Sequence, residues 1–109
     1  MAFAEVPPIP LRLLPDSCEV RAPDGAGGFM PAREIRRVRA AVRASWSSSA
    51  HRSGGCSGVL YVDAANSIGA FEVPAGSRVS VRGNDYLAAS VRRYDRADGA
   101  AHHWEVELA

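Results

Sequence analysis

The sequence predicts an all-β domain built from antiparallel strands, on three observations. Residues 78–82 alternate apolar Val79 and Val81 with polar neighbours, which is typical of a strand with one buried and one wet face. Residues 83–85 are Gly-Asn-Asp, and all three tolerate the positive φ that a tight hairpin requires. Residues 102–108 show a second alternating pattern, in which every other side chain points to the same face. We therefore expect an antiparallel unit near the C-terminal end, onto which the upstream segments assemble.

Length and composition indicate a single domain with no bulk preference for nucleic acid. The chain has 109 residues and a net charge of +1, and typical domains hold about 100 to 150 residues. A charge so near zero gives no electrostatic argument for a nucleic-acid partner. All 13 basic residues are Arg, so every cation can form forked contacts with carboxylates. An Arg-, Ala- and Gly-rich composition without Lys, Thr or Gln is explained by a GC-rich coding bias.

The cysteine content and the hydropathy pattern predict a soluble protein made in the cytoplasm. Cys18 and Cys56 are the two cysteines, and they form no Cys-x-x-Cys pair. Two free thiols are expected in a reducing compartment. No charged leader with an apolar core opens the chain, and no apolar run approaches the about 20 residues needed to cross a bilayer. No membrane association is expected.

Residues 1–16 are predicted to form an extended, proline-rich arm, and residues 17–109 a single β domain. Prolines at positions 7, 8, 10 and 15 exclude a continuous helix or a paired strand. The arm nevertheless carries apolar side chains that favour burial, among them Ile9, Leu13 and Leu14. We expect the arm to lie against its own domain or against a neighbouring subunit.

The next segment is a short strand followed by a flexible loop. Residues 17–22 place Cys18 and Val20 on one face, and residues 23–28 are rich in Gly. Phe29 and Met30 stand at the far end of this loop. The pair either forms an exposed contact patch or folds back onto the core.

Residues 35–46 fit two patterns, and we predict a strand. Apolar residues occupy alternate positions, as in a strand, at Val38, Ala40, Val42 and Ala44. A second set falls near helical spacing, and Ala and Arg are good helix formers: Ile35, Val38, Val42 and Trp46. The strand is favoured because the flanking segments are also predicted as strands and a meander is then consistent.

The remaining segments continue the β pattern. We expect a loop over residues 47–58, a buried strand over 58–63, a connection over 63–70 and a turn at 74–76 leading into the strand at 78. If residues 83–85 form the whole hairpin loop, Arg82 lies opposite Tyr86 and Val81 opposite Leu87. That register gathers the apolar residues on one core face: Val79, Val81, Leu87, Ala89 and Val91. In the last strand one face carries His102, Trp104, Val106 and Leu108.

No motif predicts a catalytic residue, a cofactor site or a metal site. His102 and His103 are adjacent, and neighbours in a strand point to opposite faces, so the doublet does not supply two ligands to one ion. We expect His102 in the core and His103 on the wet face. No serine lies in a nucleophile elbow, and the Gly-rich stretch at 25–28 lacks a P-loop lysine. The protein is therefore predicted not to be an enzyme.

A run of arginines leaves two explanations open. It comprises Arg33, Arg36, Arg37, Arg39 and Arg43. The run is either the solvated face of a strand or a surface that meets phosphate or an acidic partner subunit. The candidate subunit or partner contacts, taken over the whole chain, are the apolar residues of the arm and loop with part of this run: Ile9, Leu13, Leu14, Phe29, Met30, Arg37, Arg39 and Arg43.

Four motifs in order give the chain a resemblance to a known family. They are IPLRLLPD at 9–16, VLYVD at 59–63 with Asn66 and Ser67, GSRV at 76–79 with GNDY at 83–86, and HHWEVEL at 102–108. The set resembles the small minor capsid proteins of tailed bacteriophages and prophages, and is similar in layout to their head-completion or stopper proteins. The segments at 35–46 and 47–58 depart from that pattern.

The resemblance implies a small antiparallel β-barrel or sandwich with long loops, acting as a structural virion protein. Such a protein joins the portal vertex to the tail and is assembled in the bacterial host cytoplasm. Its implied partners are portal or adaptor proteins, tail-joining proteins and further copies of itself in a ring, whereas alone it is a monomer. Ring contacts between identical copies would be heterologous. No catalytic residue is implied.

The alternative function is a compact nucleic-acid-binding barrel of OB type. The arginine run, together with Trp46 or Tyr61, would then form the contact surface. Stacking platforms need aromatic residues interleaved with the cations, and only Trp46 lies near the run in sequence. This favours the structural role, with DNA contact as the second possibility.

Overall fold

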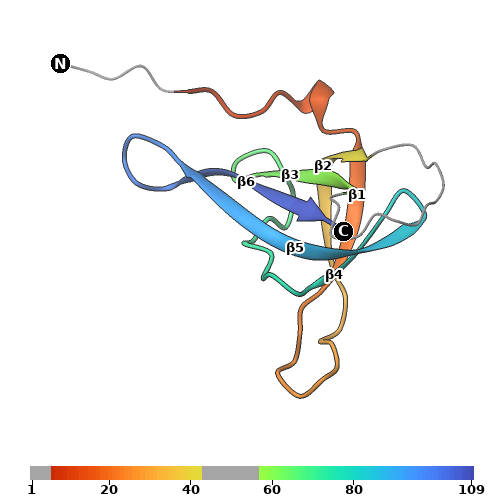
Figure 1. Ribbon diagram of the computed structural model, residues 1–109. Coiled ribbons are helices and arrows are strands. Elements are labelled where there is room, and N and C mark those ends of the chain that lie inside the picture. The colour runs from red at the N-terminus through yellow and green to blue at the C-terminus, as the bar shows by residue number, and fades with distance from the viewer. Residues whose placement is uncertain (1–5, 43–56) are drawn as a thin grey trace.

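Six antiparallel strands close into a small barrel. The computed structural model describes residues 6–42 and 57–109. The strands are β1 (Asp16–Arg21), β2 (Arg33–Val42), β3 (Gly58–Asp63), β4 (Arg78–Val81), β5 (Asn84–Asp95) and β6 (Ala101–Leu108), preceded by the 3-10 turn η1 (Leu11–Leu13). Their order around the barrel is β1-β2-β3-β6-β5-β4 (Figure 1). The all-β prediction is confirmed, and of barrel and sandwich the barrel is correct.

The barrel interior is filled by side chains from all six strands. Alternate residues point inward because successive side chains of a strand leave opposite faces. Val73, from the connection between β3 and β4, adds a further buried side chain. The core consists of Cys18, Val20, Ile35, Val38, Ala40, Leu60, Val62, Val73, Val79, Val81, Ala88, Trp104, Val106 and Leu108. The interior is therefore a packed core.

The ambiguous segment is a strand, as predicted, over its described part Arg33–Val42. Its helix-like spacing has a local cause, a β-bulge at Arg37, where φ is 62°. Asp16 pairs with Val38 and Ser17 with Arg36, so Arg37 has no partner in the ladder. Ile35 and Val38 consequently both face inward although they are three residues apart. Residues 43–46 lie outside the described residues.

The predicted register of the β4–β5 hairpin is wrong. The loop contains two residues, Arg82 and Gly83, with φ of 54° and 76°, and Asn84 already pairs with Val81. Two consecutive positive φ values belong to a type I′ turn, whose twist matches the strands. Local preference for positive φ favours a loop at residues 83–85, whereas the observed turn begins one residue earlier, at Arg82.

The corrected register changes the core face of β5. Val79 pairs with Tyr86, and Ala88 is the buried residue of this strand, whereas Leu87 is 49% exposed. Ala89 is also exposed. A shift of the β5–β6 register between Ala88 and Ser90 then leaves Val91 half-buried. Leu87 and Ala89 are thus removed from the predicted core.

The other strand predictions are confirmed. Cys18 and Val20 are buried in β1, and β3 spans Gly58–Asp63. In β6, Trp104, Val106 and Leu108 are buried. The predicted loop at 47–58 falls largely outside the described residues. Figure 1 shows the arm along one end of the barrel and the β1–β2 loop projecting from the opposite end.

Candidate interaction surfaces and the arm-docking site

A buried carboxylate organises the end of the barrel on which the arm lies. Asp63, the last residue of β3, is fully buried. Its Oδ2 accepts hydrogen bonds from the backbone N–H groups of Ala65 at 3.0 Å and Asn66 at 2.8 Å, while its Oδ1 accepts from Ile9 N–H at 2.9 Å. Backbone donors thus offset the cost of burying this side chain.

The same connection supports the bulge of β2. The Ser67 Oγ accepts from the Asp63 backbone N–H at 2.8 Å and donates to the Arg37 carbonyl at 2.6 Å. Arg36 and Ile68 exchange two backbone hydrogen bonds, of 3.0 and 2.9 Å. An Asp followed by small residues and Asn-Ser is a typical local turn signal, but its link to the arm required the tertiary structure.

The arm is held to the barrel through its backbone. Besides the Ile9 N–H bond to Asp63, the Asn66 Nδ2 donates to the Ile9 carbonyl at 2.8 Å. The His102 Nε2 lies 2.8 Å from the Pro7 carbonyl. We call Asp63, Asn66 and His102 the arm-docking site. Because a carbonyl only accepts, His102 carries a proton on Nε2 in this contact.

Backbone docking leaves most apolar side chains of the arm facing solvent. Val6 is 69%, Leu11 50% and Leu13 39% exposed, whereas Leu14 is 3% exposed. Of the three predicted arm contacts, Leu13 is therefore available to a partner and Ile9 is half-buried. Leu14 packs within its own domain and is withdrawn as a partner contact. The arm thus lies against its own barrel, one of the two expected placements.

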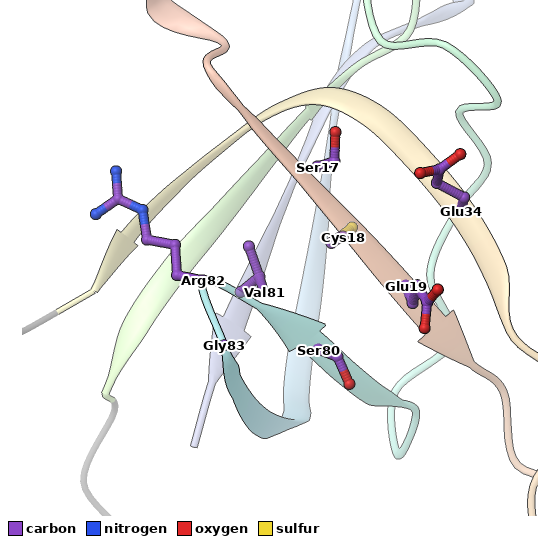
Figure 2. Close-up of a pocket in the computed structure, with 8 residues that line it drawn as sticks. All are labelled: Ser17, Cys18, Glu19, Glu34, Ser80, Val81, Arg82 and Gly83. Atoms are coloured by element: carbon purple, nitrogen blue, oxygen red, sulfur yellow. The ribbon is translucent and has the colours of Figure 1, made fainter.

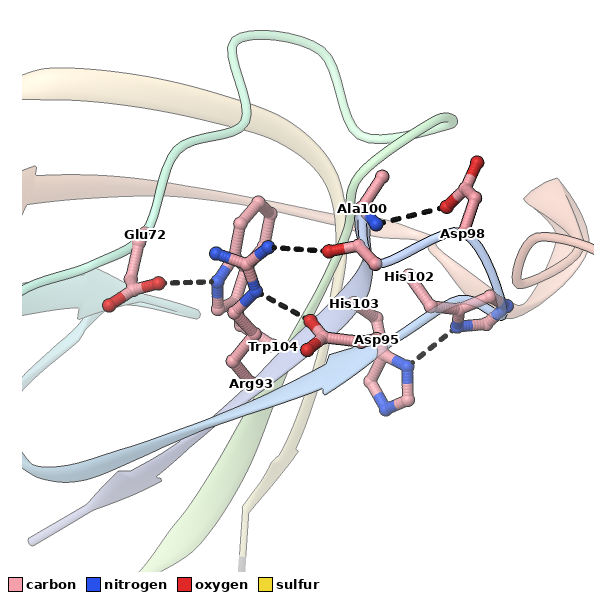
Figure 3. A network of polar contacts seen from close by, with 9 residues as sticks. Glu72, Arg93, Asp95, Asp98, Ala100, His102, His103 and Trp104 are labelled. Carbon is pink, nitrogen blue, oxygen red and sulfur yellow. Dashed lines mark hydrogen bonds and ion pairs between the residues drawn. The ribbon is translucent and has the colours of Figure 1, made fainter.

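The two histidines of β6 form one polar chain, contrary to their predicted separation. The His102 and His103 Nδ1 atoms are 2.8 Å apart (Figure 3), and the His103 Nε2 lies 3.1 Å from Glu105 Oε2. The His103 ring stacks on Tyr94, with centroids 4.7 Å apart. His102 is half-buried beneath the arm rather than in the core. The β5–β6 register shifts at this point: Tyr94 pairs with His103 and Asp95 with Ala101. His102 is therefore the extra residue of a bulge, and the regular alternation of faces is interrupted there.

The β1–β2 loop presents a second apolar surface. Phe29 is 43% and Met30 50% exposed, so the pair does not fold back onto the core. The Asp24 Oδ1 accepts from the backbone N–H groups of Ala26 at 2.7 Å and Gly28 at 3.0 Å. These bonds hold the pKa of the Asp24 carboxyl below its usual range. Phe29 and Met30 together are called the loop patch.

The arginine run is part of a mixed-charge surface. Arg36, Arg37 and Arg39 are exposed, while the Arg33 guanidinium carbon lies 3.7 Å from the centroid of the Phe71 ring. Arg39 pairs across strands with Tyr61, which in turn pairs with Glu105. An acidic residue therefore stands on the far side of the tyrosine. Arg43 lies outside the described residues.

Cys18 borders a shallow pocket on the opposite wall from β6. The pocket has a volume of about 230 Å³ and is lined by Ser17, Cys18, Glu19, Glu34, Ser80, Val81, Arg82 and Gly83 (Figure 2). Glu19 and Glu34 are cross-strand partners there. Burial raises the pKa of the Cys18 thiol to about 12, so the reactive thiolate is disfavoured. Cys56 lies outside the described residues.

Within residues 6–42 and 57–109, no cluster of three or more His, Cys, Asp or Glu side chains is placed to hold a metal ion. In that same part of the chain no helix has the length and apolar character to span a membrane. Comparisons with protein-family models, curated proteins and solved structures returned no match.

Proposed function

We propose that this protein is a structural virion component, a minor capsid or head–tail connector subunit that joins the portal vertex to the tail. One observation carries the proposal: exposed apolar residues gather at opposite ends of a filled barrel. The arm carries Val6, Leu11 and Leu13 at one end, and the loop patch carries Phe29 and Met30 at the other. A subunit that bridges two different neighbours needs two such surfaces.

The geometry also suits assembly into a ring. Because the two apolar surfaces differ, a contact between identical copies through them would be heterologous, and such contacts close into rings when the rotation permits. The sequence resemblance to phage minor capsid and stopper proteins points in the same direction. Arg37 and Arg39 add cations that form forked contacts with acidic partner surfaces. The role is non-enzymatic.

The direct experiment is co-sedimentation with any portal or tail-joining protein encoded in the same genome. We expect the wild-type chain to sediment with one of them. Met30→Asp in the loop patch and Leu13→Asp in the arm should each weaken binding about tenfold or more, because each buries a charge in an apolar contact.

Leu87→Asp provides the matched control. Leu87 is 49% exposed, close to the 50% of Met30, but lies on the barrel wall. It should bind like the wild type. Failure of the wild-type chain to bind any portal, adaptor or tail-joining protein would count against the proposal, as would equal loss in all three variants.

Nucleic-acid binding is the second candidate, because Arg39 and Tyr61 lie side by side on the outer wall. The barrel has six strands in the order β1-β2-β3-β6-β5-β4, whereas an OB barrel has five, so the OB form of this alternative is not supported. A titration with single-stranded DNA discriminates the two roles. Micromolar binding that falls steeply with salt would favour this candidate.

A further inference from the structure

A row of hydrogen-bond contacts runs beside the arm, and the group at each end of the row is an acceptor. It runs from the Pro7 carbonyl through His102 and His103 to the Glu105 carboxylate, with contacts of 2.8, 2.8 and 3.1 Å. A carbonyl oxygen and an ionised carboxylate accept hydrogen bonds and donate none. While Glu105 is ionised, every proton that these three contacts require must therefore come from the two imidazole rings.

Counting protons shows that two neutral rings are not enough. Three contacts need three N–H groups: one on His102 Nε2, one between the two Nδ1 atoms, and one on His103 Nε2. Two neutral imidazoles carry two protons in total. The observed set therefore holds one additional proton. It resides on an imidazole, or on Glu105 donating back to His103, and the total is the same in each case.

The geometry points to a new site: His102, His103 and Glu105 form a binding site for a single proton, and its occupancy latches the arm onto the barrel. The occupied site makes all three contacts, including the one to the Pro7 carbonyl. The inference does not depend on the proposed virion role.

The groups around the site do not replace this proton. From β3, the Asp63 carboxylate is engaged by the backbone N–H groups of Ile9, Ala65 and Asn66. From β5, Tyr94 stacks on His103, and Arg92 pairs with Glu105 across the strands. Arg92 thus places a cation on the strand next to Glu105.

The remaining neighbours come from the β5–β6 turn and from the arm. Arg96 lines the cavity that His102 shares with the arm and forms an ion pair with Asp98 at 2.8 Å. Residues 6–10 of the arm carry no ionisable side chain. Histidine is the side chain whose charge ordinarily changes between pH 5 and 8, so an experiment on the site has to cover that range.

When the site loses its proton, the contact between His102 and the Pro7 carbonyl is lost, and the contact between His103 and Glu105 is kept. If the neutral pair kept the Pro7 contact, the His103 Nε2 lone pair would face a carboxylate. Shifting the tautomers instead keeps His102 donating to His103 and His103 donating to Glu105. His102 Nε2 then becomes an acceptor opposite the Pro7 carbonyl, and that contact is lost. Rising pH therefore weakens arm docking, and falling pH strengthens it.

The test is hydrogen exchange of the Ile9 amide, followed by NMR from pH 5.5 to 8.5 and corrected for intrinsic exchange. Ile9 is the first arm residue with an amide after Pro7 and Pro8. We expect its protection to fall about fivefold as the histidine pair loses its proton, which corresponds to about 1 kcal/mol for one hydrogen bond. A His51→Asn background leaves His102 and His103 as the remaining histidines, so imidazole ¹⁵N signals report their tautomers directly.

Glu105→Gln is the decisive variant. A glutamine amide donates to His103 Nε2 and supplies the third hydrogen, so two neutral rings then satisfy the whole chain. This variant should keep the arm docked at high pH, with Ile9 protection independent of the histidine titration. Glu107→Gln, two residues further along β6, should behave like the wild type.

Two results would overturn the proposal. One is unchanged Ile9 protection across the titration of the wild-type pair. The other is a Glu105→Gln variant with the same pH dependence as the wild type. Near-ultraviolet circular dichroism of each variant shows whether the barrel remains folded during the measurement.

Discussion

Cys18 shows how a position in the barrel alters side-chain chemistry. It is 3% exposed in β1. Burial is the main cause that raises the pKa of its thiol from 9.0 to about 12, although a backbone hydrogen bond from Ile35 opposes the shift. The alternation of polar and apolar residues in β1 was sufficient to predict that Cys18 points inward.

The Cys18 shift predicts a loss of stability in alkali. The folded state favours the neutral thiol. The contribution of Cys18 to the free energy of unfolding is therefore fully present below pH 9.0 and is lost as pH rises toward about 12. Each pH unit in that window should lower the free energy of unfolding by about 1.4 kcal/mol. Urea unfolding at pH 8, 9.5 and 10.5 in a Cys56→Ser background measures this slope.

Cys18→Ala is the control for that slope. It should be less stable at pH 8 because the core loses volume, but its stability should fall less steeply with pH. Parallel curves for the two proteins would show that Cys18 is not the responsible group. The three tyrosines, which also ionise in alkali, are common to both proteins.

At the scale of elements, the bulge in β2 explains why the sequence pattern was ambiguous. Arg37 adopts φ of 62°, and this one extra residue changes the spacing of inward side chains from two to three. Periodicity alone does not distinguish a bulged strand from a short helix. The bulge is supported from another segment, since the Ser67 Oγ donates to the Arg37 carbonyl at 2.6 Å.

The bulge predicts different effects on stability for the same substitution at two nearby positions. Arg37→Asn should stabilise the protein by about 0.5 to 1 kcal/mol, because asparagine tolerates the left-handed backbone better than arginine does. Arg39→Asn, in regular strand geometry opposite Tyr61, should be neutral or destabilising because asparagine is disfavoured in strands. Chemical denaturation of both variants measures the difference, and an equal effect at the two positions would contradict the assignment of strain to Arg37.

The hairpin error has a related cause. Residues 83–85 favour positive φ individually, yet the turn uses Arg82, with φ of 54°. Arg82 also lies 3.1 Å from Asp16 on β1, a contact between segments far apart in sequence. Local preference identified the hairpin, and a one-residue difference in the loop then moved Leu87 to the outside.

At the scale of the molecule, the arm is an appendage tied to a barrel that is complete without it. The barrel closes through β1–β4 and β3–β6 pairing, and the arm adds three polar contacts at one end. β1 begins at Asp16, one residue before the predicted start of the β domain at residue 17, and Leu14 already belongs to the buried interior.

Removing residues 1–9 should leave a folded barrel that is less stable by about 1 to 3 kcal/mol. The loss comes from the missing hydrogen bonds and from re-solvation of the Asp63 carboxylate. Tryptophan fluorescence during urea unfolding measures it. Asn66→Ala should cost stability in the full chain and much less in the truncated one, because its partner at Ile9 is then absent. An equal cost in both chains would show that Asn66 does not act through the arm.

The sequence by itself determined the strands, the inward faces of β1, β3 and β4, and the presence of an arm, because alternation and proline positions are local properties. Only the tertiary structure decided how β3 meets β6 and β1 meets β4, where β2 bulges, and that Pro7, His102 and Glu105 lie along one polar chain. These features join residues up to 95 positions apart. Their energies depend on contacts between segments that come together only when the barrel closes. The periodicity of apolar residues does not encode those contacts.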